Sequence, residues 1–67
     1  MISDKITERE IEVMQWIAHG RTYEEAGQYL NVSYETVQTH VKKVLRKLEA
    51  NNKTHAVAIL YREGLIV

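Results

Sequence analysis

The chain has 67 residues, enough for one compact domain and too few for two. It contains no proline and no cysteine, and the absence of cysteine excludes disulfides, Cys-ligated zinc, iron–sulfur clusters and thiol nucleophiles. Nine basic and nine acidic residues give a formal net charge of zero, unlike the strongly basic composition of many nucleic-acid binders. No apolar run approaches the roughly 18 residues that would span a membrane, and no export signal is recognisable, so we expect a cytoplasmic protein without a membrane partner.

Two Thr-x-x-Glu sequences, Thr7 to Glu10 and Thr22 to Glu25, predict where the first two helices begin. In this capping box the threonine hydroxyl accepts a hydrogen bond from the third helical amide, and the glutamate accepts one from the amide of the threonine. Apolar residues at three- and four-residue spacing then predict a first helix over about 8–19, which Gly20 ends, and a second over about 23–30.

A short turn is expected after the second helix. Asn31 tolerates a positive φ, only Val32 follows it, and Ser33 is a strong N-cap for a third helix over about 34–49. A connection this short makes the two helices cross steeply.

The remainder of the chain predicts one more helix, over about 53–63. Asn52 or Thr54 can cap it, and Gly64 can end it before an apolar tail. Because strand signals are weak throughout, we predict an all-α domain of four helices spanning residues 1–67.

The third helix has two contrasting faces. Its apolar residues fall within an arc of roughly 100° on a helical wheel, and the opposite arc is polar. That polar arc holds Glu35, Gln38, Thr39, Lys42, Lys43, Arg46 and Lys47. Residues 1–32 carry six acidic and three basic side chains, and residues 33–67 carry three acidic and six basic ones. This asymmetry indicates an anionic partner for the second half.

Such a helix suits the major groove of DNA, where amide, hydroxyl and ammonium groups pair with base edges. The first turns of a recognition helix reach the bases, and here they carry Gln38, Thr39 and Lys42. We expect phosphate contacts from the rest of the polar arc and from the start of the helix, namely Lys43, Arg46, Lys47, Ser33 and Thr36. Glu35 can accept from cytosine N4 or repel the DNA backbone, and its position does not decide between the two. The alternative for the whole face is an ordinary solvated surface.

Motifs along nearly the whole chain resemble the LuxR-type (GerE-like) helix-turn-helix domain. They are Ile6-Thr7-Glu8-Arg9-Glu10 with Val13, Trp16-Ile17-Ala18-x-Gly20-x-Thr22, Leu30-Asn31-Val32-Ser33-x-x-Thr36-Val37-x-x-His40, Lys47-Leu48, Asn52-Lys53-Thr54-x-Ala56-Val57 and Gly64-Leu65-Ile66. Within that family, the stretch from Asn52 to Val57 and Trp16 look most like the domains attached to acyl-homoserine-lactone receptors, which act in quorum sensing.

The resemblance implies a bacterial transcription regulator that binds double-stranded DNA as a dimer. It places Gln38, Thr39 and Lys42 at base-contacting positions and Ser33, Thr36, Lys43 and Arg46 near phosphates. RNA polymerase is a further candidate partner, and we expect no cofactor, no metal and no small-molecule site within this chain.

Two residues depart from the family pattern. Ala26 and Gly27 stand where the family usually has a large aliphatic residue followed by alanine. Glycine costs a helix about 1 kcal/mol relative to alanine, which would loosen the second helix, but it lets neighbouring helices approach closely.

The three histidines do not indicate an enzyme or a metal site. None has a histidine partner four residues away, and a zinc site would need all three from separate helices. For His40, at the edge of the apolar stripe, we expect a partly buried imidazole hydrogen-bonded to backbone rather than a DNA contact. No catalytic constellation is present.

The fourth helix is apolar on all sides between Ala56 and Tyr61, more than one buried stripe requires. We therefore expect a symmetric homodimer, at least on DNA, with an interface formed by Val57, Ala58, Ile59 and Tyr61. Alternatively, Tyr61 and the tail, Leu65 to Val67, cover this face within one chain. A different class of function, a protein-interaction module that pairs with a larger regulator, is also compatible with the zero net charge.

Overall fold

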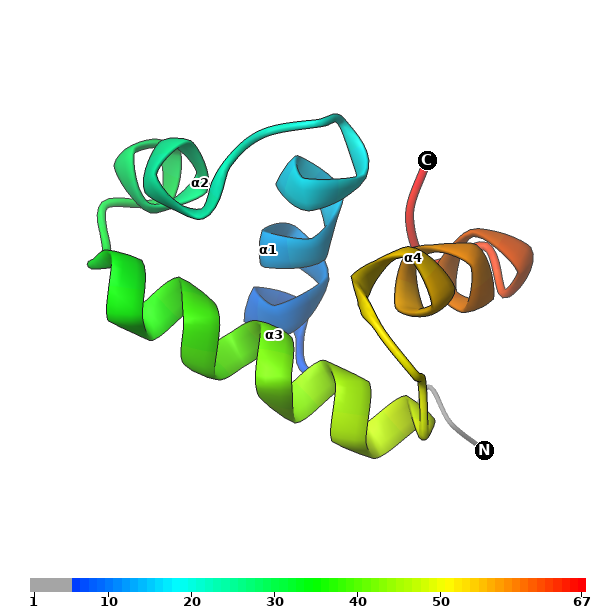
Figure 1. Ribbon diagram of the computed structural model, residues 1–67. Helices are drawn as coiled ribbons and strands as arrows, with labels where there is room; N and C mark the ends of the chain where they lie inside the picture. Colours follow the sequence, from blue (N-terminus) through cyan, green and yellow to red (C-terminus); the bar gives the residue numbers. More distant parts are fainter. Residues whose placement is uncertain (1–5) are drawn as a thin grey trace.

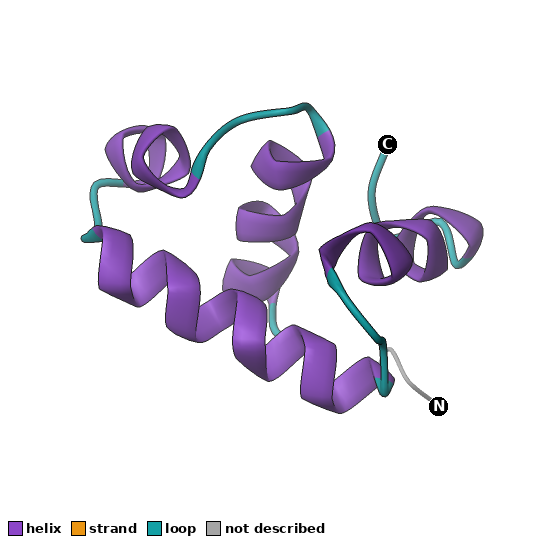
Figure 2. Cartoon of the chain, viewed as in Figure 1, coloured by secondary structure: helices purple, strands orange, loops and turns teal. Residues whose placement is uncertain are grey.

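The computed structural model describes residues 6–67, which form four helices joined by short loops and contain no strand (Figures 1 and 2). The helices are α1 (Glu8–Ala18), α2 (Tyr23–Leu30), α3 (Tyr34–Leu48) and α4 (Lys53–Arg62). Each begins where the sequence predicts, and three of them end one residue earlier than predicted. The all-α fold class is confirmed.

The starts of the first three helices are capped by the expected side chains. Thr7 with Glu10 and Thr22 with Glu25 form the two predicted capping boxes. Ser33 caps α3, with its hydroxyl oxygen accepting from a first-turn amide. Because each cap satisfies an otherwise free amide and contributes about 1 kcal/mol, these residues fix where the helices begin.

The turn between α2 and α3 is tight because Gly27 has no side chain. Asn31 takes the predicted left-handed conformation, with φ of 62°, and the Val32 amide donates to the Gly27 carbonyl at 2.9 Å. A Cβ on Gly27 would lie 2.7 Å from the carbonyl oxygen of Val32. The glycine therefore permits the close approach that its low helix propensity opposes.

Helix α1 lies between α2 and α4, and α3 runs across all three (Figure 1). Helices α2 and α4 pack on α1 and α3, and they meet each other through the side-chain contact of Lys53 with the Tyr23 ring. One apolar core forms where the helices meet, and it includes the buried side chains of Ile6, Val13, Met14, Ala26, Val37, Val41, Val44, Leu48, Ala56, Leu60 and Ile66. Every helix contributes to this core, so no helix can rotate about its axis without exposing apolar surface.

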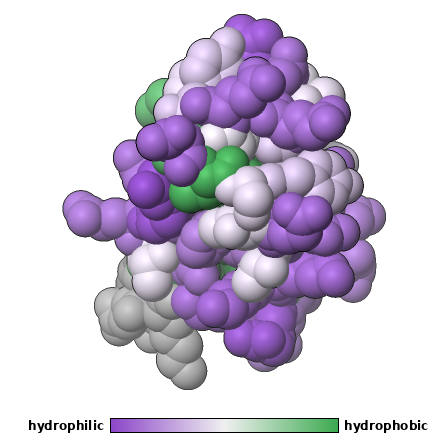
Figure 3. All heavy atoms as spheres, turned by 90° about the vertical axis from the view of Figure 1, so that its left-hand side faces the viewer, coloured by the Kyte–Doolittle hydropathy of each residue, from purple (hydrophilic) through white to green (hydrophobic). Residues whose placement is uncertain are grey.

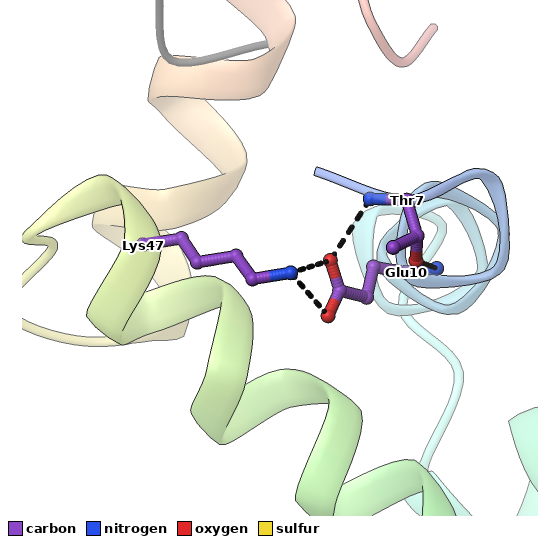
Figure 4. A network of polar contacts seen from close by, with 3 residues as sticks. All are labelled: Thr7, Glu10 and Lys47. Atoms are coloured by element: carbon purple, nitrogen blue, oxygen red, sulfur yellow. Dashed lines mark hydrogen bonds and ion pairs between the residues drawn. The ribbon is translucent and has the colours of Figure 1, made fainter. Parts of the chain in front are cut away.

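Glu10 is only 2% exposed and joins α1 to α3 (Figure 4). The Lys47 Nζ atom donates to both of its carboxylate oxygens, at 2.8 and 2.9 Å, and the Thr7 amide donates to Oε1 at 3.0 Å. Burial raises the pKa of Glu10, but the hydrogen bonds and charge of Lys47 and the hydrogen bonds of Thr7 together outweigh burial. The pKa of Glu10 therefore lies below its ordinary value of 4.5.

The C-terminal residues return to α1. Ile66 is buried in the core, and the side-chain amide of Gln15 forms two hydrogen bonds with the backbone of Val67. Gln15 Nε2 donates to the Val67 carbonyl oxygen at 2.6 Å, while the Val67 amide donates to Gln15 Oε1 at 3.1 Å. The tail is thus held by α1.

Substituting Lys47 by methionine tests the ion pair. The variant keeps most of the side-chain volume but leaves the Glu10 carboxylate without its cation, so we expect a loss of about 2 kcal/mol in the free energy of unfolding. Because the folded-state pKa of Glu10 is lowered, the stability that the pair contributes is fully present above about pH 5 and is lost as the pH falls through the folded pKa.

The measurement is urea unfolding of both proteins between pH 7 and pH 3. The difference in unfolding free energy between wild type and Lys47→Met should shrink below pH 4.5. The matched control is Lys43→Met, which removes the same charge from an exposed position on α3. A difference that stays constant with pH, or an equal loss in the control, would contradict the role of this pair.

Candidate nucleic-acid interface

Helix α3 buries one side and exposes the other. Val37, Val41, Val44 and Leu48 are at most 5% exposed and face the core. The opposite side carries the exposed residues Glu35, Thr39, Lys42, Lys43 and Arg46, and Gln38 and Thr36 are half-buried at its edges. The structure thus brings the expected base-contacting residues together on one accessible surface, which we call the α3 face.

The start of α3 adds hydroxyl groups to this surface. The exposed Ser33 hydroxyl accepts from the Thr36 amide at 3.1 Å and lies 2.9 Å from the Thr36 hydroxyl. The view onto the side of the molecule that carries the α2–α3 turn is largely hydrophilic, with a small hydrophobic area near its middle and another at its upper left edge (Figure 3). The start of the helix therefore carries two neighbouring hydroxyl groups.

Charge on the α3 face is predominantly positive. Lys42, Lys43 and Arg46 are exposed there, and Glu35 is the acidic exception near the helix start. The exposed carboxylates of Glu8 and Glu12 lie on α1, where Glu12 forms an ion pair with Arg9. Ammonium, guanidinium, amide and hydroxyl groups in this arrangement can pair with base edges and phosphate oxygens.

Lys47 is placed differently from the other cations of α3. The sequence pattern predicts a phosphate contact for it, whereas its ammonium group is bound to the buried Glu10 carboxylate. Its side chain is 22% exposed. In the structure Lys47 anchors α3 to α1, and the sequence offered no sign of this because the two partners are 37 residues apart.

His40 and His55 lie in surroundings that concern the fold rather than catalysis or metal binding. His40 is partly buried as expected, but its Nδ1 atom is buried without a hydrogen-bond partner, so the predicted backbone hydrogen bond at that atom is absent. The amide of His55 donates to the Asn52 side chain, and its ring Nδ1 accepts from the Asn51 amide at 3.1 Å. Asn52 is therefore the cap of α4, and His55 completes the capping arrangement.

Helix α4 is less uniformly apolar in space than in sequence. Ala56 and Leu60 are fully buried, and Val57 and Ile59 are half-buried against the core. Ala58 and Tyr61 are exposed, Tyr61 to 67%. The tail packs on α1 and leaves Tyr61 uncovered, so one chain alone does not cover this side of α4.

Two aromatic residues and a lysine beside α3 have no role in the sequence predictions. Tyr23 and Tyr34 have their ring centroids 5.7 Å apart, and the Lys53 Nζ atom lies 4.8 Å from the centroid of Tyr23. Each of the three is the first residue of its helix. The predicted helix starts were therefore the one feature of the sequence that these residues share.

Within residues 6–67, no group of three or more histidine or acidic side chains is arranged to hold a metal ion. None of the four helices has the length and hydropathy needed to cross a membrane.

Comparison with known proteins agrees with this geometry. Residues 4–60 match the family described as bacterial regulatory proteins, luxR family. The chain is 38% identical over 97% of its length to the uncharacterized transcriptional regulatory protein YxjL of Bacillus subtilis, and 48% identical over 91% to the transcriptional activator protein SolR of Ralstonia solanacearum. It covers 30% and 26% of those two proteins.

The solved structure of transcription factor GerE superimposes on this chain with a TM-score of 0.88, at 26% identity over 91% of each chain. The helix order, the tight turn before α3 and the family match agree, and they identify a transcription regulator domain rather than an enzyme. The chain belongs to the luxR family of bacterial regulatory proteins and forms the helix-turn-helix DNA-binding domain of that family.

Proposed function

We propose that this domain reads a specific DNA sequence by inserting α3 into the major groove. The observation that carries the proposal is the α3 face, a polar and cationic surface whose opposite side is fixed in the core. The groove is about 12 Å wide and accepts one helix, so a single exposed helical face is the right size for it.

Base contacts fall to residues in the first turns of α3. Lys42 can donate to guanine O6 and N7, Gln38 can pair with adenine N6 and N7, and Thr39 can pair with several bases. Glu35 is exposed beside them and can accept from cytosine N4. This mixture of donors and acceptors supports discrimination between base pairs.

Phosphate contacts fall to the ends and edges of the same face. Lys43 and Arg46 supply charge, and Ser33 and Thr36 supply hydroxyl groups at the positive end of the helix dipole. We leave Lys47 out of this set, because moving its ammonium to a phosphate would strand the buried Glu10 carboxylate.

The direct test is a fluorescence anisotropy titration with a duplex of random sequence at low salt. A domain that binds phosphates should show measurable affinity without its operator, and that affinity should fall steeply as salt is added. Absence of binding at low salt would contradict the proposal and favour a protein-interaction module.

Two alanine variants distinguish base from phosphate contacts. Lys42→Ala should lose about 1 to 3 kcal/mol of discrimination between specific and random duplexes. Arg46→Ala should weaken binding to both equally and make the salt slope shallower by about one unit. Each variant is the control for the other, measured by anisotropy over a range of salt. If Lys42→Ala loses equal affinity for both duplexes, Lys42 contacts a phosphate rather than a base. If the salt slope of Arg46→Ala is unchanged, Arg46 does not contact DNA.

We further propose that two copies pair through α4 when bound to DNA. The exposed Ala58 and Tyr61, with the half-buried Val57 and Ile59 at their edges, form the surface offered for pairing. One short helix buries little area, so the pair should be stable only when adjacent half-sites hold both copies. Symmetric pairing would double the number of base contacts.

Selection of binding sites from a random duplex library tests this pairing. The selected sequences should be inverted repeats with half-site centres about 10 base pairs apart. For Tyr61→Glu, which buries a charge in the proposed interface, single half-sites should be selected instead, with the same half-site sequence. Single half-sites for the wild type, or repeats that survive the substitution, would contradict pairing through α4.

The chain spans about a quarter to a third of the length of its matched relatives. The role of a whole regulator that contains this domain is therefore a separate proposal. Higher identity to the activator SolR than to YxjL supports activation of transcription in the bacterial cytoplasm, and Trp16 with the Asn52–Val57 motif supports a quorum-sensing regulator. RNA polymerase is then the second partner. Transcription from a template with a selected site should rise when the domain is added to the purified polymerase, and no rise would count against direct activation.

A further inference from the structure

A small aromatic and cationic surface lies beside the start of α3. Tyr23 begins α2, Tyr34 begins α3 and Lys53 begins α4, and side-chain contacts join all three. We call these residues the Tyr23–Tyr34–Lys53 ledge. They line a shallow hollow of about 300 Å³ together with Thr22 and Glu24.

The ledge lies at the side of the α3 face. Successive residues of an α-helix are about 100° apart, so Tyr34 lies on the same side of α3 as Leu45, about a quarter turn from Glu35. A helix in the major groove has base edges in front of it and the sugar–phosphate strands on either side. Tyr34 would therefore face one of the two sugar–phosphate strands that border the groove.

Lys53 is available to an anionic partner. It is exposed, no ion pair involves it among residues 6–67, and the first turn of α4 contains no acidic residue. Its Nζ atom lies 4.8 Å from the Tyr23 ring centroid, a cation–π contact that holds the ammonium close to α3 while leaving it in solvent. Ordering the side chain in advance reduces the entropy lost when a partner binds.

The tyrosines supply hydroxyl groups that can donate hydrogen bonds. Burial raises the pKa of Tyr23, and the neighbouring Tyr34 adds to that increase. Tyr34 is 45% exposed and can meet a partner directly. A cation beside neutral hydroxyl donors is a suitable chemical environment for a phosphate oxygen.

We propose that the ledge binds a phosphate of the DNA strand that flanks α3, with Lys53 as the cation and Tyr34 as a hydroxyl donor. This inference rests on the proposed insertion of α3 into the major groove. It extends the DNA-contacting surface from the helix-turn-helix to the first residue of α4. Contact with DNA would then also involve the helix that we propose for pairing.

The key variant is Lys53→Met, which keeps an unbranched side chain on the Tyr23 ring and removes the charge. Anisotropy titrations with random duplex over a range of salt should show several-fold weaker binding and a salt slope shallower by about one unit. Lys53→Arg should retain the slope. The matched control is Arg62→Gln, which removes an exposed cation from the other end of α4 and should leave affinity and slope unchanged.

Two further variants test the surroundings of Lys53. Tyr34→Phe should weaken binding without changing the slope, because it removes a neutral donor. Glu24→Gln should tighten binding, because the Glu24 carboxylate lines the same hollow and repels a phosphate there. Thermal unfolding of each variant verifies that the fold is retained.

The outcomes separate this inference from the proposed function. If the wild type binds and Arg46→Ala has a shallower slope while Lys53→Met behaves as wild type, the ledge is outside the interface and only this inference is overturned. If Lys53→Met and Arg62→Gln lose affinity equally, the effect is one of net charge and the ledge is again excluded. If the wild type does not bind duplex DNA at low salt, both proposals are overturned.

Discussion

Burial of Val37, Val41, Val44 and Leu48 fixes the rotation of α3 about its own axis, and the position of every proposed DNA-contacting side chain follows from that rotation. Each fully buried aliphatic side chain contributes about 1.5 to 3 kcal/mol. The free energy of unfolding of a domain of this size is only several kcal/mol in total. Turning α3 so that its apolar stripe is exposed would therefore cost more free energy than the folded state has in reserve. A rigid apolar side therefore presents a fixed polar one.

A single carboxylate connects helix formation to the placement of α3. Glu10 closes the capping box of α1 and also binds Lys47 near the C-terminal end of α3. The N-terminus of α3 is held by a different device, the close contact of Gly27 with the turn. The helix is thus restrained at both ends by contacts outside its apolar stripe, which suits an element that must keep its orientation against DNA.

Local signals predicted most of the fold because each acts over a few residues. The capping boxes, the Ser33 cap and the left-handed Asn31 depend on side chains next to the backbone that they fix. The Glu10–Lys47 pair, the hydrogen bonds of Gln15 with Val67 and the Tyr23–Tyr34–Lys53 ledge depend on which helices meet, and no local spacing encodes that. His40 shows the same limit, since its partial burial followed from the stripe but its hydrogen bonding did not.

We propose that the surface opposite the buried stripe of α3 meets DNA. The most direct measurement is the change in backbone amide chemical shifts of the ¹⁵N-labelled domain as duplex DNA is added. We expect the largest changes between Ser33 and Arg46, with smaller ones at the start of α2 and α4. Unchanged α3 amides, with the largest changes on the exposed side of α1, would contradict this proposal.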